Sequence, residues 1–518
     1  MSSNSLTDSL NTMPDSTQNI YQKVVDHCRQ TAVLSSVSSV LGWDERTQLP
    51  ASAGQHRADQ MTLLSGMIHE RNTDPRMGDW LAQLAESPLA ADPHGDTGTT
   101  IRQLRRDYDK ATRLPRSLVE ELTRTAVMGQ QAWEKARAAD DFSLFRPLLT
   151  KTIGLKQQQA DALGFSECRY DALLDEFEPG EKTSNIRRVL AGLREELVPL
   201  VAAIANSPRK APVELLAREF PASRQSEFGR AAAARIGFDF QRGRLDTTAH
   251  PFCTELGPHD VRITTRYDER FFPSAFFGIL HEAGHGLYEQ GLRPDMWGLP
   301  PGQAVSLGIH ESQSRMWENL VGRSRAFWQY FFPQAQHVFP TALGQVSLDD
   351  FLFAINDVRP SLIRVEADEV TYNLHILIRF ELEPPLLDGD LPVEDLPAAW
   401  NSLYRQYLGI EAPSAADGVL QDIHWSFGAL GYFPTYTLGN LYAAQFFEAA
   451  ERDLGSLEPQ FADGAFEPLL KWLRENIHRH GQCYGSAQLV QRISGRPLTH
   501  APLMNYLKRR FGSLYGLK

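Results

Sequence analysis

Apolar residues recur at three- and four-residue intervals along most of this 518-residue chain, and this spacing constrains its fold more than any other feature. The interval matches the turn of an α-helix, so each such segment can bury one face. Polar or proline-containing connections such as 86–97 and 207–212 separate the segments. We predict amphipathic helices over residues 20–41, 56–71, 116–138, 142–163, 184–206 and 223–236. The expected fold class is therefore all-α.

One segment departs from the helical pattern. In residues 260–267, β-branched and aromatic side chains alternate with polar ones at a period of two, which predicts a short strand pair. We find neither a repeat of fixed period nor a Gly/Ser linker long enough to separate independent domains. The sequence thus predicts a single helical domain over residues 18–518, preceded by a mobile tail at 1–17 that is rich in Ser, Thr, Asn and Asp.

Charge and cysteine content narrow the range of partners and compartments. Fifty-two Lys and Arg residues against 64 Asp and Glu residues give a net charge of −12, which repels nucleic acid and anionic lipid. No apolar run reaches the length of about 18 residues that a membrane span needs, and no signal peptide is expected. The four cysteines lie far apart in the sequence. We therefore expect a cytoplasmic protein with no nucleic-acid or membrane partner.

The strongest chemical signal is a His-Glu-x-x-His motif that begins at His281 on a predicted apolar helix. His281 and His285 are one helical turn apart, so both imidazoles can bind one metal ion. Glu282 can take a proton from a metal-bound water and return it to a leaving amine. The alternative interpretation is a chance pair of histidines on a core helix. Gly284 and Gly286 favour the metal site, because each costs about 1 kcal/mol inside a helix and indicates close approach of another group.

A catalytic metal needs a third protein ligand, and three glutamates follow the motif. Glu289 lies two turns beyond the first histidine on the same helix, too far along its axis to close the site. Glu311 and Glu318 lie on a second predicted helix. The glycine and prolines at 291–301 allow that helix to fold back on the first. We predict Glu311 as the third ligand.

Glu311 also has a simpler interpretation as a surface ion pair with Arg315, four residues later. His310, which precedes it, is assigned to the surroundings of the site rather than to the metal. Two histidines and one carboxylate leave a fourth position open for water, as in catalytic zinc sites. Zn²⁺ is therefore the predicted cofactor, with Co²⁺ as the alternative ion.

Further short motifs occur around this one in a fixed order. They are H-P-F at 250–252, D-x-R-x-T at 260–264, H-E-S-Q at 310–313, I-R-x-x-A-D at 363–368 and G-x-x-Q-D-x-H-W at 418–425. Together with the segment 41–50, in which Leu49 stands where Met is common, they resemble the carboxypeptidase Taq family of zinc metallocarboxypeptidases. The resemblance runs from about residue 20 to the C-terminus.

The resemblance implies a nearly all-helical fold related to neurolysin and angiotensin-converting enzyme, with a small β element beside a long active-site groove, and usually a homodimer. It also implies zinc bound by His281, His285 and Glu311, with Glu282 catalytic. The expected activity is release of single C-terminal amino acids from peptides with a free carboxylate. The alternatives are an endopeptidase or dipeptidyl carboxypeptidase on the same fold, or a non-catalytic peptide-binding zinc protein.

An enzyme that acts at the C-terminus must recognise a free carboxylate, and a guanidinium suits this task. Arg364 is the first candidate. We interpret residues 361–375 as a helix on which Arg364, Asp368, Tyr372 and His375 form a polar stripe that lines a cavity. The alternative is a structural salt bridge between Arg364 and Asp368.

A Gly-containing segment at 421–436 places an imidazole near two phenols. Such groups can donate hydrogen bonds to the oxyanion that forms during peptide hydrolysis. By the resemblance we assign transition-state stabilisation to His424 and substrate contact to Tyr432 and Tyr436. Each tyrosine could equally be a core aromatic.

Overall fold

The computed structural model describes residues 16–517. These residues form two compact units: the first contains 16–112, 293–303 and 480–483, and the second contains 113–292, 304–479 and 484–517. The predicted mobile tail at 1–17 lies almost wholly outside the described residues. The expected single domain over 18–518 stays a prediction.

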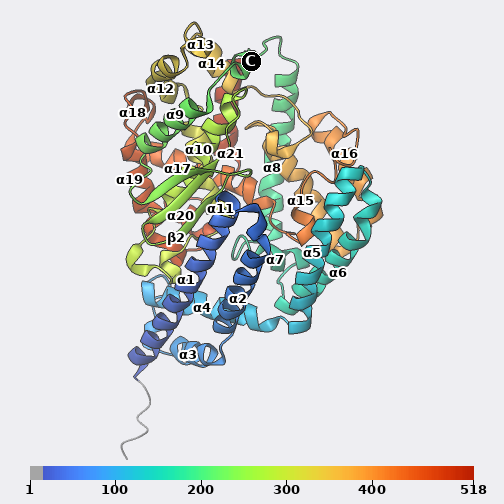
Figure 1. Ribbon diagram of the computed structural model, residues 1–518, viewed down its shortest axis with the longest axis vertical. Coiled ribbons are helices and arrows are strands. Elements are labelled where there is room, and N and C mark those ends of the chain that lie inside the picture. Colours follow the sequence, from blue (N-terminus) through green and yellow to red (C-terminus); the bar gives the residue numbers. More distant parts are fainter. Residues whose placement is uncertain (1–15, 518) are drawn as a thin grey trace, which may run out of the picture. The chain divides into compact units, whose positions relative to one another are not determined.

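The first unit is a small helical assembly. Its helices are α1 (Thr17–Thr47), α2 (Gly54–Asn72), α3 (Pro75–Ala85) and α4 (Asp96–Arg113). The side-chain hydroxyl of Ser16 caps the start of α1 by accepting a hydrogen bond from the Asn19 amide. α1 and α2 lie side by side (Figure 1), and they confirm the helices predicted at 20–41 and 56–71.

The second unit holds most of the chain and is also helical. It contains α5 (Arg116–Ala139), α6 (Arg146–Leu163), α7 (Arg169–Leu174), α8 (Thr183–Ala205), α9 (Ala222–Arg235), α10 (Phe272–Glu289), α11 (Leu307–Arg315), α12 (Arg325–Val338), α13 (Pro340–Leu343), α14 (Leu348–Ile355), α15 (Tyr372–Asp388), α16 (Leu396–Leu408), α17 (Pro434–Leu454), α18 (Glu458–Ala462), α19 (Glu467–Asn476), α20 (Ser486–Ser494) and α21 (Ala501–Tyr515). The four helices predicted between residues 116 and 236 are all confirmed.

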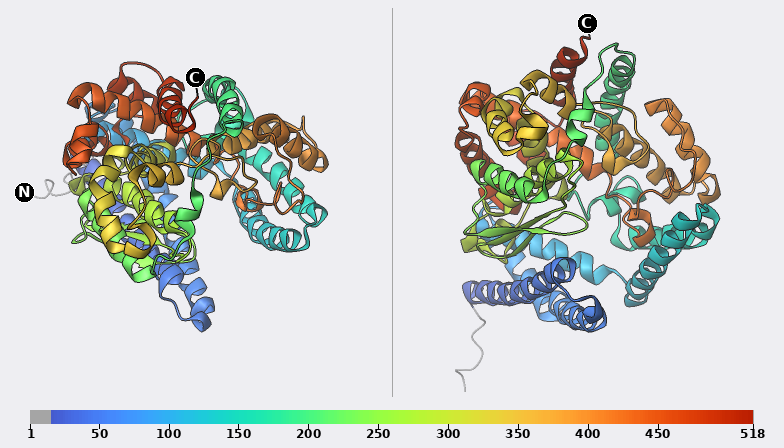
Figure 2. Two further views of the ribbon diagram at one scale, coloured as in Figure 1. Left: turned by 90° about the horizontal axis from the view of Figure 1, so that it is seen from above. Right: turned by 45° about the horizontal axis from the view of Figure 1, so that its top comes forward.

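A three-stranded sheet is the β element of this unit. Its strands are β1 (Gly243–Thr247), β2 (Cys253–Gly257) and β3 (Asp260–Thr265), in the order β1-β3-β2. The sheet is seen as green arrows in the right-hand view of Figure 2. β3 pairs in parallel with β1 and antiparallel with β2. The sequence predicted the strand at 260–267 but only one partner for it. β1 was missed because its sequence, Gly-Arg-Leu-Asp-Thr, has little β-branched or aromatic character.

α10 packs against this sheet and against an aromatic cluster. Phe276 stacks on Phe272 of the same helix and on Phe228 of α9, with ring centroids 5.2 Å apart in both pairs. Its ring also lies 5.1 Å from Trp328 of α12. Offset and edge-on aromatic packing of this kind leaves the side chains little freedom. The N-terminal half of α10 is therefore a rigid base for its C-terminal half.

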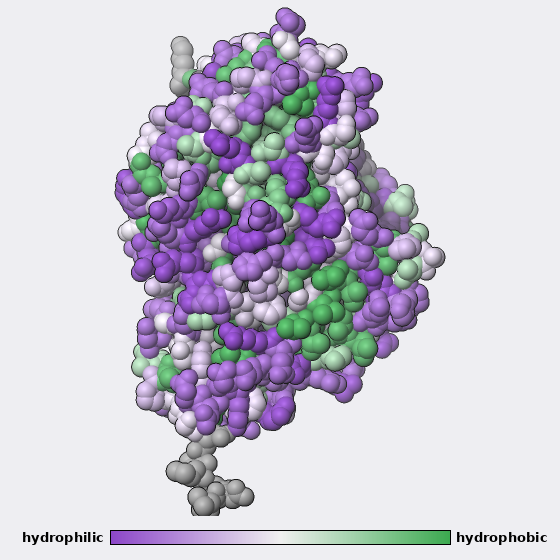
Figure 3. All heavy atoms as spheres, turned by 60° about the vertical axis from the view of Figure 1, so that its left-hand side comes forward, coloured by the Kyte–Doolittle hydropathy of each residue, from purple (hydrophilic) through white to green (hydrophobic). Residues whose placement is uncertain are grey.

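The surface is mainly polar on the face shown in Figure 3, where one compact hydrophobic patch interrupts hydrophilic side chains. Among residues 16–517, none of the helices combines the length and the apolar character that crossing a bilayer requires.

Candidate active site

The structure brings the three predicted metal ligands together. His281 and His285 lie one turn apart on α10, and Glu311 faces them from α11. The Glu311 Oε2 atom lies 3.6 Å from His281 Nε2 and 3.4 Å from His285 Nε2. Ligand atoms at bonds of about 2.1 Å around a tetrahedral ion lie about 3.4 Å apart. Two imidazole nitrogens and one carboxylate oxygen at this spacing fit a metal ion such as zinc.

Small residues let α11 approach this closely. A Cβ atom on Gly284 of α10 would lie 2.6 Å from the Ser314 Cα atom of α11, and one on Gly439 of α17 would lie 2.4 Å from Glu311 Cγ. No side chain larger than hydrogen fits at either position. The close approach predicted at Gly284 is thus confirmed as backbone packing, whereas Gly286 makes room for the ring of Phe238.

Both histidines are oriented through their Nδ1 atoms. His281 Nδ1 lies 2.9 Å from Glu318 Oε2, and His285 Nδ1 lies 3.1 Å from the main-chain oxygen of His310. These contacts leave the Nε2 atoms for the metal, the usual arrangement around ligating histidines. Glu318, one of the three candidate ligands, therefore supports a ligand instead. It lies in a π-helical segment, Met316–Val321, that follows α11 directly.

Glu311 is held by its own neighbours on α11. Arg315 Nε donates to Oε1 at 2.7 Å, and Ser314 Oγ donates to Oε2 at 2.9 Å. The ion pair with Arg315 exists, but both side chains are largely buried rather than solvated. Burial alone would raise the pKa of Glu311, yet Arg315 and the two histidines outweigh it and hold that pKa well below its usual range. Glu311 is therefore ionised and directs one oxygen at the histidines, as a metal ligand would.

Glu282 is buried next to the ligands, at 7% exposure. Burial raises the pKa of its carboxyl to about 7, with His281 opposing the shift and Glu311 adding to it. A carboxyl whose pKa lies near neutrality can both accept and release a proton.

The remaining candidates surround this centre. Glu289 Oε1 accepts a hydrogen bond from His310 Nε2 at 2.7 Å, and His310 Nδ1 lies 2.5 Å from His285 Nδ1. Neither residue joins the cluster of possible ligands, which among the described residues contains His281, His285 and Glu311.

The helix predicted at 361–375 is wrong except for its last turn. Residues 364–366 form a single 3₁₀ turn, and α15 begins only at Tyr372. The Asp368 carboxylate explains the break, because it accepts hydrogen bonds from the amides of Val370 and Thr371 and from the Thr371 hydroxyl. A side chain that satisfies local amides in this way replaces helical hydrogen bonds. The proposed polar stripe along one helix does not exist.

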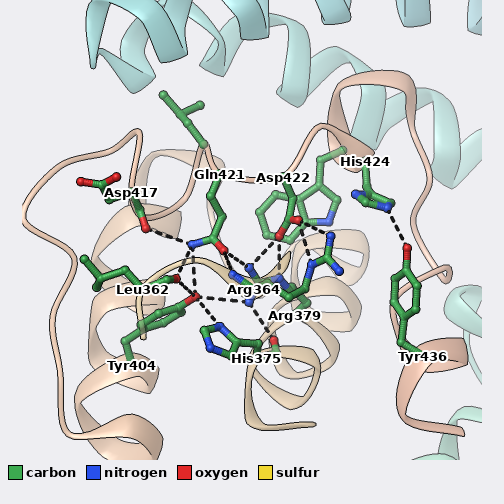
Figure 4. A network of polar contacts seen from close by, with 12 residues as sticks. Leu362, Arg364, His375, Arg379, Tyr404, Asp417, Gln421, Asp422, His424 and Tyr436 are labelled. Carbon is green, nitrogen blue, oxygen red and sulfur yellow. Dashed lines mark hydrogen bonds and ion pairs between the residues drawn. The ribbon is translucent and has the colours of Figure 1, made fainter. Parts of the chain in front are cut away.

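Arg364 pairs with Asp422 instead of Asp368. Its Nε and Nη2 atoms lie 2.9 and 2.8 Å from Asp422 Oδ1, and Nη1 donates to the Tyr372 hydroxyl at 3.1 Å. Arg379 of α15 donates to the other oxygen, Asp422 Oδ2, at 2.8 and 2.6 Å. Figure 4 shows the two guanidinium groups on one carboxylate. The alternative reading of an Arg364–Asp368 salt bridge is also wrong.

Tyr372 lies between the cluster of predicted metal ligands and Arg364. The Arg315 guanidinium stands over its ring, 4.6 Å from the centroid, while its hydroxyl accepts from Arg364. A chain of direct contacts thus runs from the ligand Glu311 through Arg315 and Tyr372 to Arg364.

His424 and the two predicted tyrosines lie together beside Arg364. His424 begins the 3₁₀ turn His424–Phe427, and its Nε2 atom is 3.5 Å from the Tyr436 hydroxyl (Figure 4). Its ring centroid is 5.3 Å from that of Tyr432, and Arg364 stands 5.1 Å from the ring centre of Tyr436. Burial raises the pKa of both tyrosines, and the charge of Glu311 adds to the shift. Both tyrosines are partly buried, and Tyr436 also packs against the hydrophobic core.

A family model for the carboxypeptidase Taq (M32) metallopeptidases matches residues 23–511 of this chain. The chain belongs to that family. As an M32 member it is a metallocarboxypeptidase, which implies peptide substrates and a divalent metal.

Named M32 relatives agree over nearly the whole chain. Thermostable carboxypeptidase 1 of Thermus thermophilus is 48% identical over 506 residues, which is 96% of this chain and 99% of that protein. Carboxypeptidase 1 of Bacillus subtilis is 38% identical, with coverages of 95% and 97%. The structure of the M32 carboxypeptidase from Deinococcus radiodurans R1 superposes with a TM-score of 0.92 at 43% identity, covering 96% of this chain and 100% of that one.

Sequence reasoning missed several groups that hold the site of this metallocarboxypeptidase. Asp422 binds Arg364 and is itself held by Arg379, and Glu318 contacts the predicted ligand His281. Asp422 stood in the quoted G-x-x-Q-D-x-H-W motif, so its place there was an available signal. Arg379 stood out as a charge in the otherwise apolar run Ile376–Phe380. The position of Glu318 in the sequence did not indicate that its carboxylate would contact His281.

Proposed function

We propose that this chain is a zinc-dependent carboxypeptidase that releases single amino acids from the free C-termini of peptides. The observation that carries the proposal is the cluster of His281, His285 and Glu311 with the buried Glu282 beside it. Zinc bound there would activate a water molecule and polarise the scissile carbonyl. A metal ion held by these three residues would keep a fourth position for water, whereas structural zinc sites are normally closed by a fourth protein ligand.

Glu282 serves as general base and then as general acid. Its carboxylate takes a proton from the attacking water and delivers it to the leaving amine. A pKa of about 7 suits both steps near neutral pH. His424 donates a hydrogen bond to the oxygen on which negative charge develops. Burial lowers the His424 pKa to about 4, so the imidazole is neutral, and its buried Nδ1 atom has no partner among the described residues.

Arg364 receives the terminal carboxylate of the peptide. The hydrogen-bonded group of Arg364, Arg379 and Asp422 contains two positive charges and one negative charge, so it carries a net positive charge in a buried place. This net positive charge attracts an anion that reaches the group. Tyr432 and Tyr436 contact the C-terminal end of the peptide substrate, because both rings lie beside His424.

Product analysis separates this activity from its alternatives. We expect one unblocked peptide to give a ladder of products that shorten by single residues, with no products after C-terminal amidation or chelation. Internal cleavage of the amidated peptide would indicate an endopeptidase, and release of dipeptides a dipeptidyl carboxypeptidase. Refilling the chelated protein with Zn²⁺ or Co²⁺ and measuring each rate identifies the effective ion.

We also propose a cytoplasmic homodimer. Val33, Val37 and Val40 form an exposed row on one face of α1, with 53%, 45% and 39% of their surfaces accessible, which suits a protein contact. All four cysteines are free, as expected in a reducing compartment. Sedimentation of the wild type and of Val37→Glu tests the dimer, and a wild-type monomer at micromolar concentration would refute it.

A further inference from the structure

A cavity of about 330 Å³ lies in the second unit among α5, α6 and the turn that follows His424. Its walls are largely apolar and include Val119, Leu122, Leu155 and Phe427. None of the metal ligands and no member of the Arg364 group lines it. The volume is at the lower end of the range for small-molecule sites, so a ligand of a few carbon atoms would fit.

One charged side chain, Lys156 of α6, lines this cavity. It is only 9% exposed, and no hydrogen bond or ion pair holds its ammonium group among the described residues. Burial lowers the pKa of Lys156, against the opposing charge of Glu176. The side chain packs closely against the neighbouring turn, since a Cβ atom on Gly428 would lie 2.8 Å from Lys156 Cε. A buried cation without a bonded anion is unfavourable until a counter-charge arrives.

Two further polar atoms in the cavity wall lack partners. Thr125 Oγ1 and Gln159 Oε1 are both buried and make no hydrogen bond. The amide nitrogen of Gln159 is already used, since it donates to Glu176 Oε1 at 2.6 Å. Buried polar groups are nearly always hydrogen-bonded. The buried and unpaired ammonium group of Lys156 beside a largely apolar cavity therefore indicates a ligand site rather than a packing defect.

We propose that this cavity binds a monocarboxylate with a short apolar chain. The Lys156 ammonium donates to the carboxylate, and the chain fills the apolar end near Leu122 and Phe427. A free apolar amino acid and a short fatty acid share this chemistry. Because Phe427 and Gly428 belong to the turn that begins at His424, a bound ligand touches a segment of the active site.

Isothermal titration of the metal-loaded enzyme with 4-methylpentanoate and with its neutral analogue 4-methylpentanamide tests the proposal. We expect saturable binding of the carboxylate and at least about tenfold weaker binding of the amide, as the loss of a charged hydrogen bond implies. Lys156→Met should weaken carboxylate binding by a similar factor. The matched control is Lys151→Met, which removes an exposed lysine of the same helix that pairs with Glu121 outside the cavity.

A second variant tests the proposal independently in case Lys156→Met does not fold. Ala126→Phe fills the cavity from the partly exposed wall of α5 and should abolish binding with an unchanged melting temperature. Titration with leucine separates the two sources: tighter binding than 4-methylpentanoate indicates an amino-acid site, and weaker binding a fatty-acid site. The proposal is overturned if the wild type shows no saturable binding, if the amide binds equally well, or if Lys156→Met and Ala126→Phe bind like the wild type.

Discussion

The metal centre and the Arg364 group are both buried and charged, yet they are assembled in opposite ways. The metal centre takes its ligands from two regular helices, and two of them are separated by a single helical turn. The Arg364 group joins a 3₁₀ turn, a long helix and a loop, and Arg364 lies 58 residues from Asp422 along the chain. Short-range spacing along the chain brings the two histidines of the metal centre together. Only contacts between distant segments bring the members of the Arg364 group together.

The charge balance of the two regions also differs. At the metal centre Glu311 and Glu318 place negative charge beside the predicted position of the cation, and Arg315 compensates part of this charge. In the Arg364 group two guanidinium ions share one carboxylate and await an anion. We propose that each region binds a ligand of the opposite charge, a metal ion in one and the peptide carboxylate in the other. The following variants test this comparison.

Glu311→Ala should have the largest effect. Without its carboxylate the two histidines retain too few donors to hold the ion, and the peptidase rate should fall at least about 10³-fold with loss of bound metal. The metal content and the peptidase rate of the purified variant measure these two losses. Glu289→Ala, which removes the discounted carboxylate one turn beyond His285, is the matched control and should keep its metal. Metal retained at the wild-type level in Glu311→Ala would remove Glu311 from the ligand set.

Asp422→Asn tests the second region. It leaves two buried guanidinium ions without a counter-charge, and such a loss costs about 3–5 kcal/mol of unfolding free energy. Urea denaturation followed by circular dichroism measures this. Glu411→Gln, in an exposed ion pair with Arg405, should cost less than about 1 kcal/mol. Equal stabilities for the two variants would show that the Arg364 group is not electrostatically coupled.

Glu318→Gln should weaken the metal centre without destroying it. The amide is a poorer acceptor for His281 Nδ1, and losses of this kind reduce metal affinity about 10- to 100-fold. Competition with a chelator measures the affinity. An unchanged affinity would mean that the contact between Glu318 and His281 does not orient the ligand.

The effect of Glu383→Gln should be visible as a change in the pH dependence of stability. Glu383 accepts hydrogen bonds from Tyr170, Trp425 and the Gly431 amide, and burial raises its pKa to about 7. The folded state therefore binds more protons than the unfolded state between about pH 4.5 and 7, so this contribution to stability is lost as pH rises through 7.

Unfolding free energies at pH 5 and pH 8 measure the effect. We expect a decrease of about 2–3 kcal/mol from this group in the wild type, and a correspondingly smaller decrease in Glu383→Gln. Parallel pH profiles for the two proteins would contradict the assignment.

The sequence predicted the metal centre because helical geometry is local. One turn separates His281 from His285, and Gly284 marked the place where another backbone approaches. The reading of 361–375 failed because periodicity does not register a side chain such as Asp368 that bonds to nearby amides and interrupts a helix. The pairing of Arg364 with Asp422 depends on the packing of distant segments, which no spacing in the chain encodes.

The central claim is that Glu282 transfers the proton beside a metal held by His281, His285 and Glu311. Its most direct test is Glu282→Gln, with zinc content and the rate of C-terminal release measured on the same sample. We predict a zinc content equal to that of the wild type and a rate reduced about 10²- to 10⁴-fold. A near-normal rate with zinc still bound would contradict the account.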